Sequence, residues 1–307
     1  MQIKALRFFI HVAKTSSFAE TARFFGVPAS SVSRHIAALE NDIGQRLLFR
    51  HTRAVRLTDA GERYYLQVRE AIELLDAATE IAADKEVAPQ GLVRINAPVA
   101  LGRLHIAPLI NQFQQLYPAV SVELVLTDAF VDPVQEGSDI TVRVGKLADS
   151  GLVARSLGQQ QYLVCASPAY LARAGAPLQP DDLARHNCLA YKGHLGTQRW
   201  YFRRPGADSY QPYEIRGNLQ SNNAEALVAA ALSGQGIVLF PSWLYAADAF
   251  REKKLVALLS DWKASVLADP TAINLVYPES RLRSRKVRLL SDFLVERIGT
   301  PPYWEIN

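Results

Sequence analysis

The stretch that decides the fold of the amino-terminal part is residues 17–40, which read SFAETARFFGVPASSVSRHIAALE. Apolar side chains recur at helical spacing from Phe18 to Phe25. Gly26 can leave a helix with a positive φ, and Val27 can fill the space beneath the turn that follows. The pattern predicts two short helices joined by a tight turn, which is a helix-turn-helix.

The second of these helices carries the side chains that we expect to face outward. Val32, Ile36 and Leu39 form its buried stripe. The residues left at its amino end or on its outer face are Ser30, Ser31, Ser33, Arg34 and His35. Short serines let a helix approach phosphates and base edges, and an arginine can bond O6 and N7 of guanine. These five are candidate DNA contacts, although the spacing alone also fits an ordinary solvated helix pair.

A basic hairpin, or wing, is predicted directly after the helix pair. Residues 50–58, RHTRAVRLT, include Arg50, Arg53 and Arg56 and no acid. Residues 1–58 hold nine Lys and Arg against three Asp and Glu, a net of +6, whereas residues 59–90 hold three against eight, a net of −5. Arginines on a wing would contact phosphate or the minor groove. This separation of basic from acidic residues favours a segment that binds nucleic acid over a run of charged residues that only faces solvent.

The amino-terminal residues resemble the LysR-type transcriptional regulators. The positions that carry the resemblance are Leu6, Phe8, Phe9, Val12, Ser17, Phe18, Ala22, Val32, Ser33, Arg34, Ile36, Leu39, Glu40, Gly44, Leu47, Leu48, Arg50, Thr52, Arg53, Leu57, Thr58, Ala60 and Gly61. The resemblance implies a winged helix-turn-helix that reads double-stranded DNA. The chain departs from the family at Pro28, where serine is usual, and at His51, where threonine is common. Proline offers no side-chain oxygen as a cap but fits the start of a helix.

One long helix is predicted over residues 59–84. Its apolar seam recurs at spacings of 3, 4, 3, 4 and 3 residues through Tyr65, Val68, Ile72, Leu75, Thr79 and Ala82. A partner helix would cover such a seam, so we expect a dimerisation element. Packing of the helix on its own domain is the alternative. The resemblance implies a homodimer or a homotetramer, and the sequence favours neither.

Residues 85–91 contain proline and glycine and predict a hinge. Beyond it, strands are expected over 92–97, 120–126, 140–144 and 272–277, and helices over 102–116, 131–136 and 281–298. This alternation predicts an α/β sheet, and a second set of elements over about 162–256 predicts two lobes joined by crossing strands. The expected division is a DNA-binding domain (1–58), a linker helix (59–84), the hinge and a two-lobed domain (92–307). Lobe I would hold about 92–161 and 265–307, and lobe II about 162–264.

The resemblance covers nearly the whole chain and looks most like the branch similar to the regulator CrgA. In the second half it rests on positions such as Tyr117, Pro118, Asp139, Ser167 and Pro168. It implies the fold of a periplasmic binding protein that accepts a small effector between its lobes.

Open α/β sheets bind ligands beyond the carboxyl ends of strands, where helix amino termini and loops converge. The candidate effector-binding residues on this rule are Val99, Ala100, Leu101, Gly102, Thr127, Asp128, Arg143, Asn222, Asn223, Phe240 and Pro241. Free backbone N–H groups over 99–102 favour an anion, so we expect a carboxylate or a similarly polar molecule. Arg143 is the candidate counter-charge, and a structural salt bridge to Asp139 or Asp128 is an equal alternative. Many family members carry a hydroxyl where this chain has 98–100.

Other chemistry has weak support. His186, Cys188 and His194 lack a fourth ligand at usable spacing, so we expect no metal. Cys165 and Cys188 fit small core residues better than a redox pair. No phosphate loop or nucleophile elbow occurs, so neither a cofactor nor catalysis is expected. Trp200, Trp243 and Trp262 could stack on an aromatic ligand, with packing as the default.

The chain has 307 residues, 49% hydrophobic and 21% charged, which is enough to bury more than one core. Lys4, Arg7 and His11 interrupt the first apolar segment, so we expect an amphipathic helix and no secretory signal. Polar residues and Pro241 break the stretch 226–250, so we expect no membrane span.

We interpret the chain as a cytoplasmic, homo-oligomeric transcriptional regulator of the LysR type, and not as an enzyme. It would read an interrupted palindrome and respond to an effector between the lobes. Two alternatives stay open. An enzyme on a binding-protein-like domain would turn over a substrate without DNA, and a ligand-independent DNA-compacting protein would show weak sequence preference.

Overall fold

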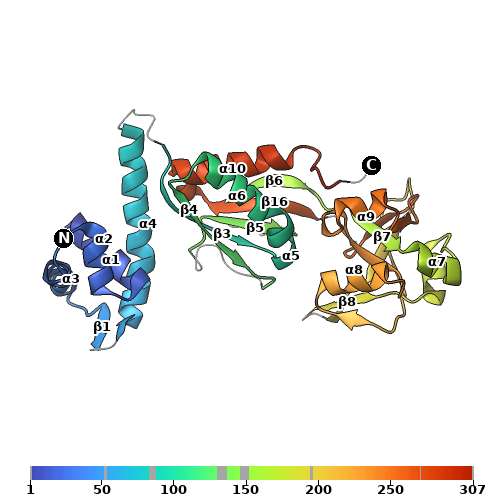
Figure 1. The fold of residues 1–307 in the computed structure, drawn as a ribbon, viewed down its shortest axis with the longest axis horizontal. Helices are drawn as coiled ribbons and strands as arrows, with labels where there is room; N and C mark the ends of the chain where they lie inside the picture. The colour runs from blue at the N-terminus through green and yellow to red at the C-terminus, as the bar shows by residue number, and fades with distance from the viewer. Residues whose placement is uncertain are drawn as a thin grey trace. The chain divides into compact units, whose positions relative to one another are not determined.

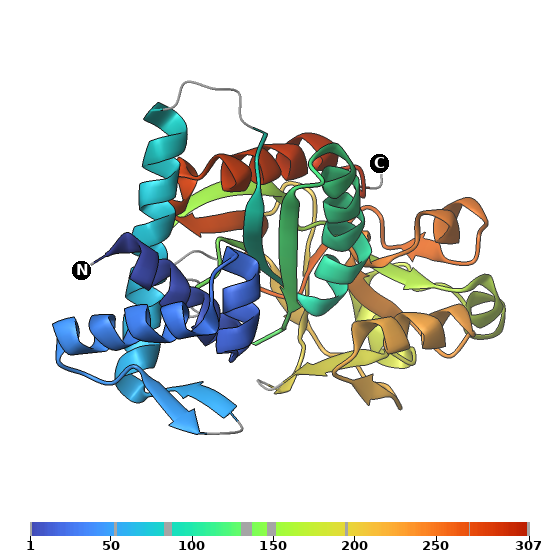
Figure 2. The same cartoon turned by 60° about the vertical axis from the view of Figure 1, so that its left-hand side comes forward.

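The computed structural model describes residues 2–51, 54–82, 88–129, 137–145, 152–193, 196–269 and 271–305. The chain divides into two compact units, one of Met1–Ala88 with Ser280–Arg288, the other of Pro89–Glu279 with Leu289–Asn307. Figures 1 and 2 show helices and a small hairpin in the first unit, and sheets with helices on their faces in the second. Within the described residues, no helix combines the length and apolar character that crossing a membrane requires.

The predicted helix-turn-helix is present. The elements of residues 2–82 are α1 (Ile3–Thr15), α2 (Phe18–Phe25), α3 (Ala29–Ile43), β1 (Leu48–His51), β2 (Ala54–Leu57) and α4 (Asp59–Ala82). Ser17 Oγ caps α2 by accepting the Glu20 N–H at 3.1 Å. Gly26 ends α2 at a φ of 63°, which a residue with a side chain rarely adopts. Pro28 precedes α3 as its amino-terminal cap and makes no side-chain bond there.

The hairpin is tied to α3 by a single carboxylate. β1 and β2 are antiparallel, with Leu48 opposite Leu57. Glu40 Oε1 accepts the N–H groups of Leu47 at 2.9 Å and Leu48 at 3.1 Å, so the last turns of α3 fix where β1 begins. These residues pack into one core with α1 and the start of α4. The hairpin therefore cannot shift without α3.

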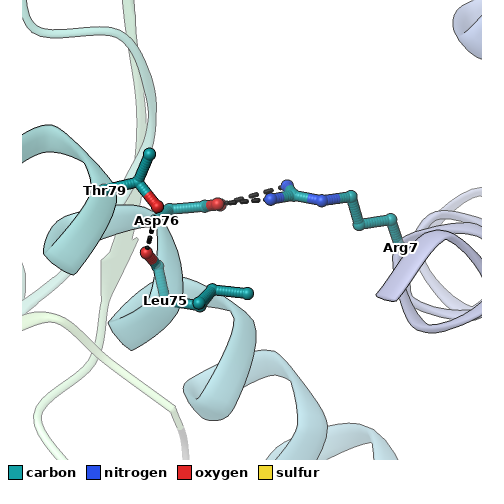
Figure 3. A network of polar contacts seen from close by, with 4 residues as sticks. All are labelled: Arg7, Leu75, Asp76 and Thr79. Atoms are coloured by element: carbon teal, nitrogen blue, oxygen red, sulfur yellow. Dashed lines mark hydrogen bonds and ion pairs between the residues drawn. The ribbon is translucent and has the colours of Figure 1, made fainter. Parts of the chain in front are cut away.

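Helix α4 packs on its own unit through part of the predicted seam. Val68 and Ile72 are each 7% exposed and belong to the core that α1 and α3 share. Figure 3 shows Arg7 of α1 reaching Asp76 of α4, with Nη1 donating to Oδ2 at 3.1 Å and Nη2 donating to Oδ1. From Val68 to Asp76, α4 therefore packs on its own domain, which was the alternative to a dimerisation seam. Leu75, farther along the seam, is 40% exposed.

In the second unit, lobe I is a five-stranded sheet. Its order is β4 (Val120–Leu126), β3 (Gly91–Ala97), β5 (Ile140–Val144), β16 (Ala272–Pro278) and β6 (Leu152–Gln159). β3 runs parallel to β4 and β5, and β16 runs antiparallel to β5 and β6. The helical segments of this lobe are α5 (Val99–Leu101), the π-helical turn η1 (Gly102–Ile106), α6 (Ala107–Leu116) and α10 (Arg285–Ile298) from Leu289 onward. The turn η4 (Glu279–Arg283) from Ser280 onward and the start of α10 are grouped with the first unit. Phe113 and Phe293 join α6 to α10, with ring centroids 5.5 Å apart.

Two expected helices of this part differ from the structure. The one expected from 102 begins at Val99 and passes through η1. At Gly102 this segment lies so close to the sheet that a Cβ would fall 2.3 Å from Leu126 Cδ2. The one expected over 281–298 is divided into the short turn η4 and the helix α10. A helix expected over 131–136 lies outside the described residues.

Lobe II contains an antiparallel sheet and a smaller sheet. The first has the order β11 (Gln211–Tyr213), β10 (Trp200–Arg203), β15 (Lys263–Ser265), β7 (Tyr162–Ala166) and β13 (Val238–Pro241), and β14 (Val256–Leu258) also pairs with β7. The second has the order β12 (Gln220–Ser221), β8 (Ala190–Gly193) and β9 (Gly196–Thr197). The helical segments are α7 (Pro168–Ala174), η2 (Pro180–Arg185), α8 (Ala224–Leu232), η3 (Ser242–Leu244) and α9 (Ala247–Arg251).

The chain passes between the lobes twice, in agreement with the crossing strands expected from the sequence. It enters lobe II from β6 to β7 and returns from β15 to β16. The Gln160 N–H donates to the Thr271 carbonyl oxygen at 2.8 Å, so the two crossing segments lie side by side.

Replacing Gly61 with alanine should loosen the DNA-binding unit. A Cβ at this position in α4 would fall 2.0 Å from the Leu47 carbonyl oxygen, which is backbone and cannot rotate away. We expect Gly61→Ala to lower the free energy of unfolding by about 1–3 kcal/mol in urea titrations followed by circular dichroism. Ala78→Ser, at an exposed position of the same helix, is the control. Equal stability of the two variants would contradict the close approach.

Candidate nucleic-acid interface and ligand cavity

Helix α3 presents part of the predicted DNA-contacting set to its surroundings. Ser30 and Arg34 are exposed, and Ser31 and Ser33 are half-buried. Ala29–Ile43 keeps Val32 and Ile36 fully buried on the opposite face, which holds the helix firmly against its unit. The two exposed side chains are therefore the ones best placed to reach a base or a phosphate.

His35 does not lie on the outer face, contrary to our expectation. Its Nδ1–H donates to the Ser31 carbonyl oxygen at 2.7 Å. Its ring stands edge-on to Phe8 of α1, with centroids 5.3 Å apart. The ring is half apolar, so packing on an aromatic neighbour while one nitrogen bonds the backbone satisfies both of its parts. Neither contact was visible in the helical spacing.

The wing arginines are only partly described. Arg56 is exposed on β2. Arg50 belongs to β1, where its backbone pairs with Val55. Arg53 lies outside the described residues. Arg56 thus carries the observable part of the predicted basic hairpin.

A cavity of about 550 Å³ opens between the lobes of the second unit, within the range of small-molecule sites. Nine of the eleven predicted effector contacts line it, namely Val99, Ala100, Thr127, Asp128, Arg143, Asn222, Asn223, Phe240 and Pro241. Leu101 and Gly102 do not, because both are buried where the helix packs on the sheet. The strand-end rule brought together segments that lie more than a hundred residues apart.

The amino end of the helix at Val99 is not free for an anion in the way we expected. The Val99 N–H donates to Asp128 Oδ1 at 3.0 Å, and the Gly102 N–H donates to the Pro98 carbonyl oxygen at 2.7 Å. A carboxylate of the protein already stands at the positive end of this helix. An acidic ligand would therefore meet a negative charge at that corner.

The other charges of the cavity wall come from both lobes. Arg143 is half-buried and lies on β5. Glu225, in the first turn of α8, forms an ion pair with Arg103 of η1, which joins lobe II to lobe I. Asn223 caps α8, because its Oδ1 accepts the Ala226 N–H at 2.8 Å. The oxygen of this predicted contact is thus engaged in holding the helix.

A half-buried histidine makes a second polar contact between the lobes. His105 Nε2 lies 2.8 Å from the Trp243 carbonyl oxygen of η3, so this nitrogen carries the proton and donates. Its Nδ1 then accepts from the Tyr303 hydroxyl at 2.7 Å. Burial lowers the pKa of His105, and the Trp243 carbonyl opposes this shift in part. The lowered pKa favours the neutral ring, and a neutral ring with its proton on Nε2 can make both bonds.

Sequence reasoning missed parts of the cavity wall in both lobes. The cavity residues that it did not assign as contacts include Asn96, Thr141, Gln160, Tyr162, Tyr191, Gln198 and Trp243. Asn96 and Thr141 interrupt otherwise apolar buried strands, a signal that could have identified them. Tyr191 and Gln198 lie in and after a small hairpin with no strand-end pattern. Trp243 lines the cavity, whereas Trp200 is 1% exposed in the core.

Both cysteines are core residues, as predicted. Cys165 and Cys188 are each fully buried, and burial raises the pKa of each thiol to about 12. In the part of the chain that the structure describes, no group of three His, Cys, Asp or Glu side chains could hold a metal ion. His194 of the weighed set lies outside that part.

Comparison with known proteins assigns both halves of the chain to one family. Residues 3–62 match the bacterial regulatory helix-turn-helix proteins of the lysR family, and residues 87–299 match the LysR substrate binding domain. The uncharacterized helix-turn-helix-type transcriptional regulator YhjC of Escherichia coli is 35% identical over 95% of this chain and 96% of its own.

Two solved structures are similar to this chain over nearly its whole length. CrgA, a LysR-type transcriptional regulator from Neisseria meningitidis, is 31% identical, with a TM-score of 0.61 over 97% of this chain and 99% of that one. The Vibrio cholerae virulence activator AphB is 30% identical, with a TM-score of 0.59 over 96% and 99%.

The two thiols should resist modification in the folded protein. With a pKa of about 12, each is a thiolate in only about one molecule in ten thousand at pH 8, and neither is exposed. We expect iodoacetamide to label neither cysteine of the native protein at pH 8 within an hour, and to label both in urea. Mass spectrometry of tryptic peptides measures this. Rapid labelling of either native thiol would show that it is accessible.

Proposed function

Because the chain belongs to the LysR family of bacterial transcriptional regulators, we propose that it binds an interrupted palindrome in promoter DNA as a homo-oligomer, under the control of a small effector held between its lobes. It is a regulator with a DNA-binding helix-turn-helix and an effector-binding domain, and not an enzyme. We place its action in the cytoplasm, where the DNA lies. The division 1–58, 59–84, 85–91 and 92–307 is part of this proposal.

The exposed face of α3 carries the DNA part of the proposal. Ser30 and Arg34 stand free of the core at and near the amino end of a helix whose opposite face is fully buried. Arg56 is exposed on the hairpin that Glu40 ties to the same helix. Arg34 would bond guanine edges in the major groove, and Arg56 would bond phosphate or the minor groove.

The proposal of a homo-oligomer is supported by apolar surface on α4. Leu66 is 37% exposed and Leu75 is 40% exposed, on a helix whose Val68 and Ile72 already pack on α1 and α3. A second copy of α4 would cover one of these leucines but not both, because they lie nine residues apart and so on opposite sides of the helix. Two DNA-binding domains joined by a pair of α4 helices would contact half-sites about one helical turn of DNA apart, or a multiple of it.

The effector part of the proposal is supported by the cavity between the lobes. Its volume of about 550 Å³ suits a small molecule, and Arg143 offers a positive charge to a carboxylate. Asp128 already caps the helix at Val99, so the carboxylate would lie toward β5 and away from that helix. We propose an effector with one anionic group rather than several.

Effector binding would act by shifting the balance between lobe arrangements. The ion pair of Arg103 with Glu225 and the bond of His105 to the Trp243 carbonyl both cross from lobe I to lobe II. A molecule between the lobes that favours one arrangement would change how dimers pack, and with it the spacing of the readers on DNA.

Genome-wide selection of DNA fragments by the purified full chain tests the proposed function. We expect a few discrete intergenic sites that share an inverted repeat, with affinity that falls as salt rises. Indiscriminate recovery would instead support the alternative of a DNA-compacting protein. The genes beside the recovered sites would indicate which metabolites to test in the cavity.

Two arginine variants should separate base reading from backbone binding. We expect Arg34→Ala to cut the preference for the selected site over random DNA about tenfold, since it removes a bidentate base contact. Arg56→Ala should weaken binding to both DNAs alike and reduce the slope of log K against log salt by about 1. Arg185→Ala, an exposed arginine of lobe II, should change neither measurement. Equal losses on both DNAs for both variants would contradict this division of roles. Fluorescence anisotropy at several salt concentrations gives all these values.

A further inference from the structure

Charged side chains from both lobes line the cavity. Among the described residues these are Asp128, Arg143 and Glu225. Asp128 is exposed and the other two are half-buried, so a dissolved molecule in the cavity can reach each of them. Glu225 forms an ion pair with Arg103, which balances its charge. Asp128 and Arg143 therefore determine which charged groups a ligand can carry.

Asp128 provides a negative charge at the edge of lobe I. Its Oδ1 accepts the Val99 N–H at 3.0 Å, and the two oxygen atoms of a carboxylate have room for further donors. Burial raises the pKa of the Tyr191 hydroxyl in lobe II, and the charge of Asp128 raises it further. The carboxylate is thus within electrostatic reach of this residue of the opposite lobe. A carboxylate and an aromatic ring in the same wall both attract a cation.

Arg143 provides a positive charge a short distance away. Asp128 follows β4 and Arg143 lies on β5, and β3 separates these two strands. Two strand spacings place the two backbones roughly 10 Å apart. The side chains shorten this gap, and the long, flexible side chain of Arg143 can adjust to what lies in it. A small molecule with a charged group at each end can therefore contact both residues.

A ligand with a single charge would be matched at one end only. A carboxylate at Arg143 would still lie near the negative charge of Asp128, and an amine at Asp128 would lie near the positive charge of Arg143. Such repulsion is weak in water but grows when a ligand displaces water from a cavity. A molecule that carries both an ammonium and a carboxylate group turns both repulsions into attractions.

The rest of the wall suits a small apolar group together with the polar head of an amino acid. Pro98, Val99, Ala100 and Phe240 give the cavity apolar surface. Lobe II also contributes Asn222, which is exposed and whose amide can donate to a carboxylate or accept from an ammonium group. Contacts from Tyr191 and Asn222 would therefore add lobe II to a site whose two charges belong to lobe I.

We propose that the effector is a zwitterionic α-amino acid with an apolar side chain, bound through its ammonium group at Asp128 and through its carboxylate at Arg143. The inference rests on the proposed effector function of the cavity and specifies its ligand. Asp128 is the residue that selects an amino acid over the plain carboxylic acid of the same shape.

A screen of the full chain with the twenty common amino acids, each at millimolar concentration and neutral pH, tests the proposal. We expect at least one apolar amino acid to raise the midpoint of thermal unfolding, because a ligand that binds the folded state stabilises it. Calorimetry then compares the tightest binder with its two analogues that lack one charge. For phenylalanine these are 3-phenylpropanoate and 2-phenylethylamine. The amino acid should bind at least about tenfold more tightly than either, since each analogue loses a charge-assisted hydrogen bond.

Two variants assign the charges to residues. Asp128→Asn keeps an oxygen atom that can accept the Val99 N–H but removes the negative charge. It should weaken binding of the amino acid about tenfold and leave binding of the deaminated acid equal or tighter, because the repulsion is gone. Arg143→Gln should weaken both the amino acid and the deaminated acid, and leave the amine unaffected or better bound.

Asp208→Asn is the matched control. Asp208 is an exposed acid of lobe II that does not line the cavity, and this variant changes the net charge by the same amount as Asp128→Asn. It should keep the preference for the amino acid. An equal loss of preference in Asp208→Asn would show that net charge, and not the position of Asp128, decides the selection.

Each other outcome contradicts the inference. A chain that binds none of the amino acids, or that binds the deaminated acid as tightly as the amino acid, has a different ligand. A preference that persists in Asp128→Asn would overturn the role of that residue. These measurements use no DNA, so failure of the proposed function is recognised separately, by fragments recovered without sequence preference.

Discussion

The hydrogen bond from the Gln160 N–H to the Thr271 carbonyl oxygen holds together the two segments that cross between the lobes. Everything in the cavity depends on this junction, because its walls belong to two separate sheets. The side chain of Gln160 takes part too, since its Oε1 accepts from Trp243 Nε1 at 2.7 Å. One residue thus joins the crossing segments and fixes an aromatic ring of the wall. Two adjacent connections constrain the lobes at one edge and leave rotation about that edge as the motion of least cost.

In the DNA-binding unit, by contrast, one helix fixes the positions of the elements packed around it. Helix α3 buries Val32, Ile36 and Leu39, and near its end Glu40 holds the first strand of the hairpin. The outward face of α3 and the hairpin therefore form one rigid surface. Rigidity is what a reader of base edges needs, whereas a cavity that responds to a ligand needs two arrangements of similar energy.

Periodicity and turn chemistry predicted most of the fold. The stripe of α3, the stop at Gly26, the hairpin and the first strand of lobe I follow from spacing alone, because each depends on neighbours close in sequence. The strand-end rule likewise found nine cavity residues. Prediction from the sequence failed where contacts between residues far apart in the chain decide the local structure. Asp128 occupies the helix end that we expected to be free, and Phe8 draws His35 away from the outer face. Gln198 and Tyr191 reach the cavity only because a small hairpin of lobe II folds over it.

The energies of the contacts across the cavity explain why a small molecule could control the lobes. The ion pair between Arg103 and Glu225 is partly solvated, with side-chain exposures of 55% and 34%, and such pairs contribute at most about 1 kcal/mol. The bond of His105 to the Trp243 carbonyl adds a similar amount, about 1 kcal/mol. A ligand can shift an equilibrium only by its differential affinity for the two states. One that bonds to both lobes gains about 0.5–1.5 kcal/mol per hydrogen bond, and keeps its bonds to both only when both lobes are within reach. That gain is comparable to the contacts already present, so occupancy by a single small molecule would suffice to change the preferred arrangement.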